Sequence, residues 1–187
     1  MSERRKFSRE AAVPLFIGLL FGFIAGYFTG GGGRPSGGLA SGGAAAPEAS
    51  GDRIGELTRA LERDPENPEL LTALGNAHYD RENWDGAIEA YEKARRKAPR
   101  DASLLSDLGA AYRNRGDLRR AVALFRRARE HDPEHWQSLL NLVLVHAFDL
   151  RDAAAAQHEF DELKRRYPEI PQLDRIEQQI SGLRAGA

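Results

Sequence analysis

The second part of this chain repeats itself with a period of 34 residues, and this periodicity constrains the fold more than any other feature. Seven positions of one unit, Leu71, Leu74, Gly75, Ala87, Tyr91, Ala94 and Pro99, return as Leu105, Leu108, Gly109, Ala121, Phe125, Ala128 and Pro133. A third copy follows as Leu139, Leu142, Ala156, Phe160 and Pro168, and its one extra residue is expected in the turn around Asp152. Because a unit of this length cannot bury its apolar face alone, such units stack into an array.

Each unit is predicted to be a pair of helices. Apolar residues recur at helical spacing after Asp52, without the alternation that is typical of strands. Pro99 and Pro133 are expected to end the second helix of their units. Gly75 and Gly109 are expected to let the two helices of a pair approach closely, with Ala87 and Ala121 opposite them. The sequence therefore predicts an all-α solenoid.

The residues quoted above resemble the tetratricopeptide repeat family over residues 68–170. The shared pattern is Leu-Gly, then an aromatic residue, then Ala-x3-aromatic and a closing Pro. The resemblance implies a right-handed superhelix whose first helices line a concave groove that binds extended or helical peptides. This sequence departs from the pattern at His78 and His146, where an aromatic residue is usual, and at Val143, where Gly is usual. We expect the third hairpin to pack a little wider as a result.

The array is expected to contain eight helices. The boundaries are a half-repeat at 52–67, three repeats at 68–101, 102–135 and 136–170, and a capping helix at 171–184. The half-repeat echoes the second helix of a unit through Ile54, Leu57, Ala60 and Pro65. The capping helix carries Leu173, Ile176, Ile180 and Leu183 on one side. Three repeats are about the minimum for a stable stack.

A membrane anchor is predicted at residues 11–29. This segment has no charged side chain, and as a helix it is roughly 28 Å long, close to the hydrocarbon thickness of a bilayer. The preceding residues 1–10 carry Arg4, Arg5, Lys6 and Arg9, which favours a cytoplasmic N-terminus and a periplasmic repeat domain in a bacterial inner membrane. A cleaved signal peptide, including a twin-arginine signal, is the alternative, but the best cleavage site, at Ala44–Ala46, lies far downstream and precedes a proline.

Glycine is concentrated at the N-terminal end of the chain. Four glycines of the predicted anchor recur every four residues and form a smooth stripe suited to close contact with another helix: Gly18, Gly22, Gly26 and Gly30. Residues 30–50 are rich in Gly, Ala and Ser and are predicted to be a flexible linker. The stripe does not say whether its partner is a second copy of the chain or a different protein.

The implied groove provides the candidate binding residues. By the repeat register, its inner positions are Thr72, Asn76, Tyr79, Asp80, Ser106, Asp107, Ala110, Arg113, Asn114, Leu140, Asn141, Leu144 and Phe148. The capping helix is expected to cover at least two of the three residues Leu140, Leu144 and Phe148. The candidate peptide contacts are Asn76, Tyr79, Arg113, Asn114, Asn141 and Leu144. Two asparagines, Asn76 and Asn141, are suited to clamp a peptide backbone, and Arg113 to hold a carboxylate.

The clamp for C-terminal carboxylates known in chaperone-binding members of the family requires Lys and Arg along the first helices. Here Thr72, Asp107, Gln137 and Asn141 occupy those places, and only Asn76 matches. This sequence therefore argues against binding of chaperone tails in that manner.

Composition excludes several function classes. The chain has 27 basic and 28 acidic side chains, whereas a dedicated nucleic-acid binder needs a basic surplus. It has no Cys and no GxSxG or HExxH motif, and we expect neither catalysis, nor a bound metal, nor a cofactor. His78 and His146 are expected to serve packing, and Pro133 separates His131 from His135.

Basic residues gather at the ends of the second helices: Arg95, Arg96, Lys97, Arg126, Arg127, Arg129, Lys164, Arg165 and Arg166. We expect them to complement the helix dipoles. A basic ridge that faces anionic lipid is the alternative.

These observations predict a non-enzymatic, membrane-anchored adaptor that binds a protein or peptide partner in its groove. The layout of anchor, linker and short repeat array is similar to that of periplasmic tetratricopeptide proteins of c-type cytochrome maturation, although no residue here supports haem ligation. The alternative is a structural organiser that self-associates through its glycine stripe and has no peptide client.

Overall fold

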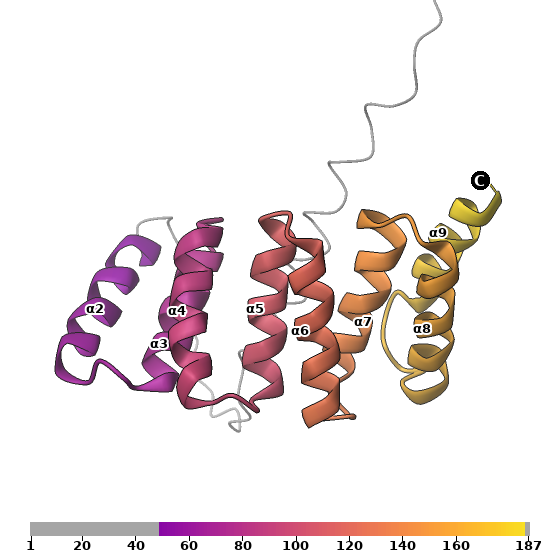
Figure 1. Ribbon diagram of the computed structural model, residues 1–187. Coiled ribbons are helices and arrows are strands. Elements are labelled where there is room, and N and C mark those ends of the chain that lie inside the picture. Colours follow the sequence, from indigo (N-terminus) through magenta and orange to yellow (C-terminus); the bar gives the residue numbers. More distant parts are fainter. Residues whose placement is uncertain (1–48, 186–187) are drawn as a thin grey trace, which may run out of the picture. The chain divides into compact units, whose positions relative to one another are not determined.

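The computed structural model describes residues 49–185, and in this range the chain forms eight α-helices, one π-helix and no strand. The elements are α2 (Ala49–Arg63), α3 (Pro68–Tyr79), α4 (Trp84–Lys97), α5 (Ala102–Asn114), α6 (Leu118–His131), α7 (Trp136–Leu144), η2 (Val145–Asp149), α8 (Ala153–Arg166) and α9 (Leu173–Ala185). Figure 1 shows the helices in a row that follows the order of the chain. The predicted all-α repeat array is confirmed.

Six of the helices begin at a side chain that accepts a hydrogen bond from the backbone of the first turn. The capping residues are Asn67, Asn83, Asp101, Asp117, His135 and Asp152, for α3 to α8 in that order. Such a cap satisfies an N–H group that has no partner within the helix, and it is worth about 1 kcal/mol. Helix starts are thus encoded locally, once per helix.

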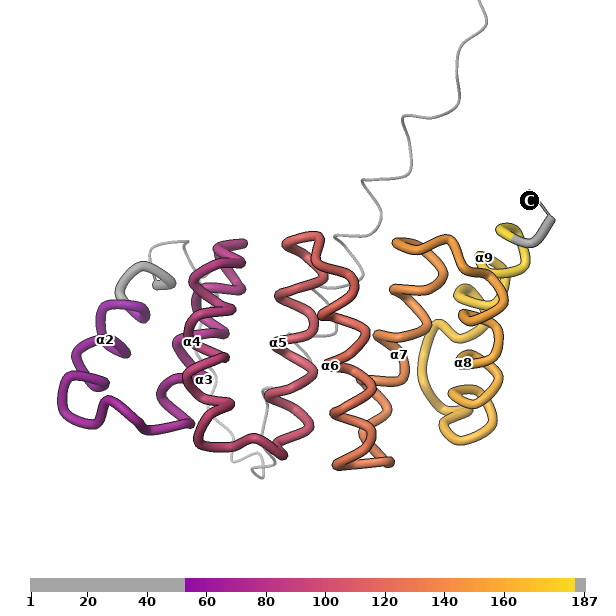
Figure 2. The backbone as a smooth tube through the Cα atoms, viewed as in Figure 1, coloured from indigo at the N-terminus to yellow at the C-terminus, as the bar shows by residue number. Residues whose placement is uncertain are grey.

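Consecutive helices pack against each other in antiparallel pairs, and Figure 2 shows how the backbone reverses after each helix. The hairpins are α3–α4, α5–α6 and α7–η2–α8, with α2 against α3 at one end and α9 against α8 at the other. The largest fully buried side chains lie between the helices: Tyr91, Phe125, Phe160, Leu104, Leu105, Leu108, Leu139, Leu142, Leu163 and Ile180. In α9, Leu173, Ile176 and Ile180 are buried, as expected of a capping helix.

Two glycines mark the closest approach within the first two hairpins. A Cβ atom on Gly75 would lie 2.4 Å from the Tyr91 ring, and one on Gly109 would lie 2.7 Å from the Phe125 ring. Each glycine therefore makes room for an aromatic ring of the facing helix. The sequence predicts Ala87 and Ala121 opposite the glycines. Both alanines are buried in the core, but the atoms nearest to a Cβ atom on each glycine belong to the Tyr91 and Phe125 rings.

The third hairpin differs through the five-residue π-helix η2. The backbone N–H of Asn83 bonds to the carbonyl of His78, and that of Asp117 bonds to the equivalent carbonyl of Tyr112, five residues back in both cases. In the third hairpin the N–H of Asp152 bonds to the carbonyl of His146, which is six residues back.

The extra residue of the third unit is therefore held inside the helix, whereas the sequence placed it in the turn. The turn itself keeps its form, because Glu82, Gly116 and Arg151 all have positive φ and each precedes a helix cap.

The N-terminal part of the chain lies outside the described residues. The predicted anchor at 11–29, its glycine stripe and all but the last two residues of the predicted linker at 30–50 are thus not tested by the structure. Between residues 49 and 185, no helix is both long enough and apolar enough to cross a bilayer.

Candidate functional site

The first helices of the three hairpins present one partly exposed face, which we call the first-helix face. Its residues stand in three rows at repeat spacing: Ala73, Asp107 and Asn141, then Asn76, Ala110 and Leu144, then Asp80, Asn114 and Phe148. All of them except Leu144 keep some solvent exposure. α3, α5 and α7 carry this face because their opposite sides supply leucines to the core.

Hydrogen bonds fix three of the predicted asparagines and connect neighbouring elements. The Tyr91 hydroxyl donates to Asn76 Oδ1 over 2.6 Å, and Asn114 Nδ2 donates to the Tyr79 hydroxyl oxygen over 2.7 Å. Asn141 Nδ2 lies 3.3 Å from Ser106 Oγ. The first contact lies within one hairpin and the other two join successive repeats, so each amide is oriented by a neighbouring element.

Tyr79 joins this face through its hydroxyl and its ring. The ring packs edge-on against Trp84, with 5.0 Å between ring centroids. Burial raises the pKa of Tyr79 above its ordinary value, against the lowering effect of the hydrogen bond from Asn114. Burial also raises the pKa of Tyr91, so both phenols stay neutral donors and acceptors at physiological pH.

Two of the predicted contacts, Arg113 and Leu144, lie in the interior. The Arg113 side chain is 5% exposed and forms an ion pair with Asp149 of η2. Leu144 is 5% exposed as a residue, and so is Leu140. The expectation that Arg113 is open to a ligand carboxylate is thereby corrected, because Asp149 already occupies its guanidinium.

Asp107 lies in the first of the three rows, on the central helix α5, and keeps a partly exposed side chain. No hydrogen bond or ion pair of its carboxylate occurs within the described part of the chain. Desolvation, assisted by the negative charge of Asp101, raises the pKa of Asp107 from 3.8 to about 7. The sequence placed Asp107 among the inner positions, but nothing in the residue pattern marked it as unpaired.

The histidines serve packing and capping. His146 is buried, and its Nδ1 lies 2.6 Å from Glu159 Oε2 of α8, while His78 Nδ1 lies 3.1 Å from Asn83 Nδ2. His135 caps α7. Across the described range, no group of three or more potential ligand side chains is arranged to hold a metal ion.

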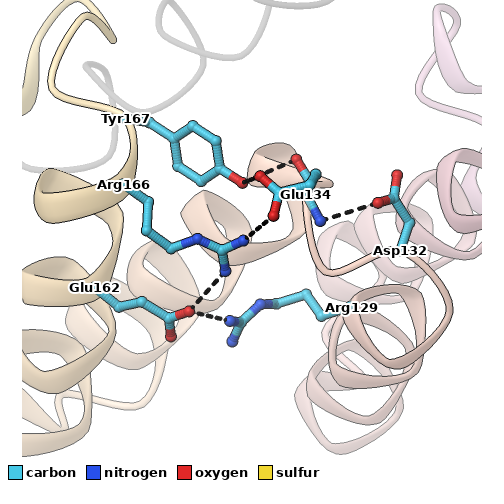
Figure 3. A network of polar contacts seen from close by, with 6 residues as sticks. All are labelled: Arg129, Asp132, Glu134, Glu162, Arg166 and Tyr167. Carbon is cyan, nitrogen blue, oxygen red and sulfur yellow. Dashed lines mark hydrogen bonds and ion pairs between the residues drawn. The ribbon is translucent and has the colours of Figure 1, made fainter.

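The basic residues at the helix ends are largely paired. Arg129 lies 2.6 Å from Glu162, and Arg166 lies 2.5 Å from Glu134. Glu162 also pairs with Arg166, so these side chains form one connected network (Figure 3). The Tyr167 hydroxyl donates to the Glu134 carbonyl over 3.0 Å. This polar cluster joins the end of α6, the following turn and the end of α8.

Three other basic residues at helix ends, Arg95, Lys97 and Lys164, also have acidic partners. Five of the nine basic residues at helix ends thus have an acidic partner, and four of these five pair with a residue of another helix or turn.

The repeats of this chain are similar to those of known proteins. Two family models, both described as tetratricopeptide repeat, match the chain, one at residues 54–102 and the other at 79–143. Among curated proteins, no sequence matches this chain.

Solved structures share the fold at low sequence identity. MamA matches with a TM-score of 0.66 at 22% identity, over 74% of this chain and 81% of MamA. YrrB, described as a TPR protein with an unusual peptide-binding site, matches with a TM-score of 0.64 at 21% identity, over 70% of this chain and 67% of YrrB. The TPR2B domain of yeast Sti1, solved in complex with pHsp70, gives 0.58 at 20% identity, over 64% of this chain and 98% of that domain. At such identities the likeness concerns the fold alone.

Proposed function

Because the chain belongs to the tetratricopeptide repeat family, we propose that residues 49–185 form a protein–protein interaction module whose first-helix face binds a peptide segment of a partner. One observation carries this proposal: three amides, those of Asn76, Asn114 and Asn141, recur along the face and are held by neighbouring residues. A side-chain amide both donates and accepts, and therefore suits the alternating N–H and C=O groups of an extended peptide. The peptide-binding site named for YrrB and the pHsp70 complex of the Sti1 domain support the proposal by analogy.

We further propose that residues 11–29 anchor this module in a bacterial inner membrane and that residues 30–50 tether it on the periplasmic side. The uncharged segment and the basic residues before it support this arrangement. A tethered module of this kind would recruit its client to an envelope assembly, such as c-type cytochrome maturation, to which the layout is similar. A reporter that is active only outside the cytoplasm, fused after Ala187, should be active, and a silent reporter would contradict the topology.

Site-specific photo-crosslinking in cells tests the binding face. A photo-reactive residue is placed at Asn76, Asn114 or Asn141, one at a time, in the full chain. Control positions lie on the second helices at Glu89, Arg127 and Asp161, which are exposed. We expect the same foreign protein from the three positions of the face and from none of the controls. Equal labelling from both sets, or no product from the face, would contradict the proposal.

The glycine stripe favours a second candidate, a self-associating organiser without a client. Gly22→Leu places a bulky side chain within the glycine stripe and prevents close approach of a second helix. The substitution should therefore dissociate an oligomer formed through this helix. If the organiser is correct, this substitution abolishes function in cells and the face yields only products of the chain with itself. If the adaptor is correct, crosslinking to the foreign protein survives the substitution.

A further inference from the structure

We infer that the peptide held by the first-helix face carries a Lys or Arg side chain whose cationic group pairs with the carboxylate of Asp107. This inference rests on the proposed function and specifies its ligand.

Asp107 is the middle residue of the first row of the face. Its helix, α5, lies between α3 and α7, and its neighbours in the same row are Ala73 and Asn141. An alanine side chain is short, so Ala73 itself does not extend over the carboxylate. Asn141 is held toward Ser106. A side chain that approaches the face from solvent therefore meets the Asp107 carboxylate without displacing an existing contact.

Three other aspartates near the first helices are already engaged, while Asp80 at the end of α3 is exposed to solvent. Asp101 caps α5, Asp117 caps α6, and Asp149 pairs with Arg113. The Asp107 carboxylate has no such contact among the described residues, although protein surrounds most of it. A carboxylate that is largely removed from water and left unpaired destabilises the fold, and a cation brought by a ligand would remove this penalty.

The charges of the face favour a cation over an anion. In the three rows, the charged residues are Asp80 and Asp107, and both are negative. The negative charges of Asp107 and Asp80 both act to raise the pKa of Tyr79 and of Tyr91, which shows that they share one region of the face. The nearby positive charge, Arg113, is matched by Asp149. A ligand carboxylate would face repulsion here, whereas a guanidinium would gain two hydrogen bonds to one carboxylate.

The first test selects peptides without assuming a sequence. A phage-displayed library of random dodecapeptides is panned against the full chain in detergent, in parallel with its Asp107→Asn variant. The matched control is Asp174→Asn, which removes an exposed carboxylate from α9. We expect peptides enriched in Lys or Arg from the wild type and from the control, and no such enrichment from Asp107→Asn.

A double-mutant cycle then locates the contact. One selected peptide is synthesised with its basic residue and with norleucine in its place, and both are titrated against wild type and Asp107→Asn. Asp107→Asn should weaken binding of the basic peptide at least tenfold and leave the norleucine peptide unchanged. A thermal unfolding midpoint of Asp107→Asn at or above that of the wild type shows that the variant is folded.

The outcomes separate this inference from the proposed function. Selected peptides that share a motif without a basic residue would overturn the preference for a cation and leave the interaction module standing. Basic peptides that bind Asp107→Asn and wild type equally would overturn the role of Asp107. If no peptide is enriched on any of the three proteins, the face is not a peptide site and both proposals fail.

Discussion

The first two hairpins and the third solve the same packing problem differently. In α3–α4 and α5–α6 a glycine of the first helix accommodates an aromatic ring of the second, and the helices pack closely. In α7–η2–α8 the equivalent position is the buried Val143, and the facing ring is Phe160. The valine fills volume that the glycines leave to the rings of Tyr91 and Phe125.

The comparison shows that the family pattern allows two ways to fill one layer. The third hairpin combines a larger side chain, a π-helix and an ion pair from Asp149 to the preceding repeat. In the first two hairpins the two helices pack closely at a glycine, which makes room for the facing aromatic ring. The predictions below test how far these arrangements can be exchanged, from the largest expected effect to the smallest.

Gly109→Val introduces into the second hairpin the residue type that the third hairpin has at the equivalent position, Val143. We expect a loss of about 3 kcal/mol in the free energy of unfolding, because the Cβ atom would lie 2.7 Å from the buried Phe125 ring. Urea unfolding followed by circular dichroism measures the loss. Gly182→Ala is the matched control: no atom lies within 4 Å of its Cβ, and alanine should stabilise α9 by about 0.5 kcal/mol. Equal effects at both sites would show that close helix approach is not required.

Asp149→Ala should remove the ion pair that distinguishes the third hairpin. We expect a loss of about 2 kcal/mol, because the Arg113 side chain is buried and loses a charged partner. Asp161→Ala, at an exposed aspartate that bonds Gln157 of the same helix, should change stability by less than about 0.5 kcal/mol. If Asp149→Ala loses no more free energy of unfolding than Asp161→Ala, the ion pair does not contribute to stability.

Asp107→Asn should stabilise the fold in a pH-dependent way. The pKa of Asp107 is raised from 3.8 to about 7, so folding favours its protonated form. That contribution is complete below about pH 4 and is lost as the pH rises through 7. The variant should therefore be more stable than wild type by about 2 kcal/mol at pH 8, after allowance for partial exposure, and nearly equal to it at pH 4.

No neighbouring group of Asp107 named below accounts for the expected change in stability between pH 4 and pH 8, which is therefore assigned to the Asp107 carboxyl itself. Asp101 lies on its own helix, Tyr79 and Asp80 come from α3, and Tyr91 comes from α4. Residues 136–144 of α7 contain no ionisable side chain, and Arg113 is paired with Asp149. Chemical denaturation at pH 4, 6 and 8 measures the difference between the two proteins, and a constant difference would contradict the assignment.

His135→Asp should give the smallest change. His135 is the one histidine among the six helix caps described, and its Nδ1 accepts from the Ser138 N–H over 3.3 Å. Burial lowers the pKa of His135, so at neutral pH the ring is the uncharged acceptor that a cap requires. An aspartate, as at Asp101 and Asp117, should stabilise the third hairpin by about 0.5 kcal/mol at pH 7, measured by thermal unfolding. A destabilised variant would show that the ring is needed for packing.

Most of the fold could be predicted from the sequence because it depends on local signals. The period of 34, the prolines at helix ends and the small polar residues at helix starts each act over a few residues, and the predicted repeats match the observed hairpins. Which side chain lies nearest to each glycine cannot be predicted from the repeat spacing alone, because it depends on the direction in which helical side chains point. A helical side chain leans toward the N-terminus and covers the turn before its own Cα, so the ring of Tyr91 reaches the level of Ala87.

The candidate site could be predicted in outline only. The repeat register proposes a set of inner positions, but which of them are buried depends on contacts between helices that are far apart in sequence. Arg113 stands in register with Tyr79 and Ala147, neither of which is a basic residue. Its partner, Asp149, comes from the part of the third unit that breaks the period. An insertion in a repeat is thus a signal for a contact that the other repeats lack.

The ion pair between Arg113 and Asp149 also affects how the repeats unfold. The stability of a repeat array is approximately the sum of the stabilities of its repeats and of the interfaces between neighbours. This pair lies between the second and third hairpins, and its arginine side chain is almost fully buried. It therefore adds to the interface term of these two hairpins and couples their unfolding.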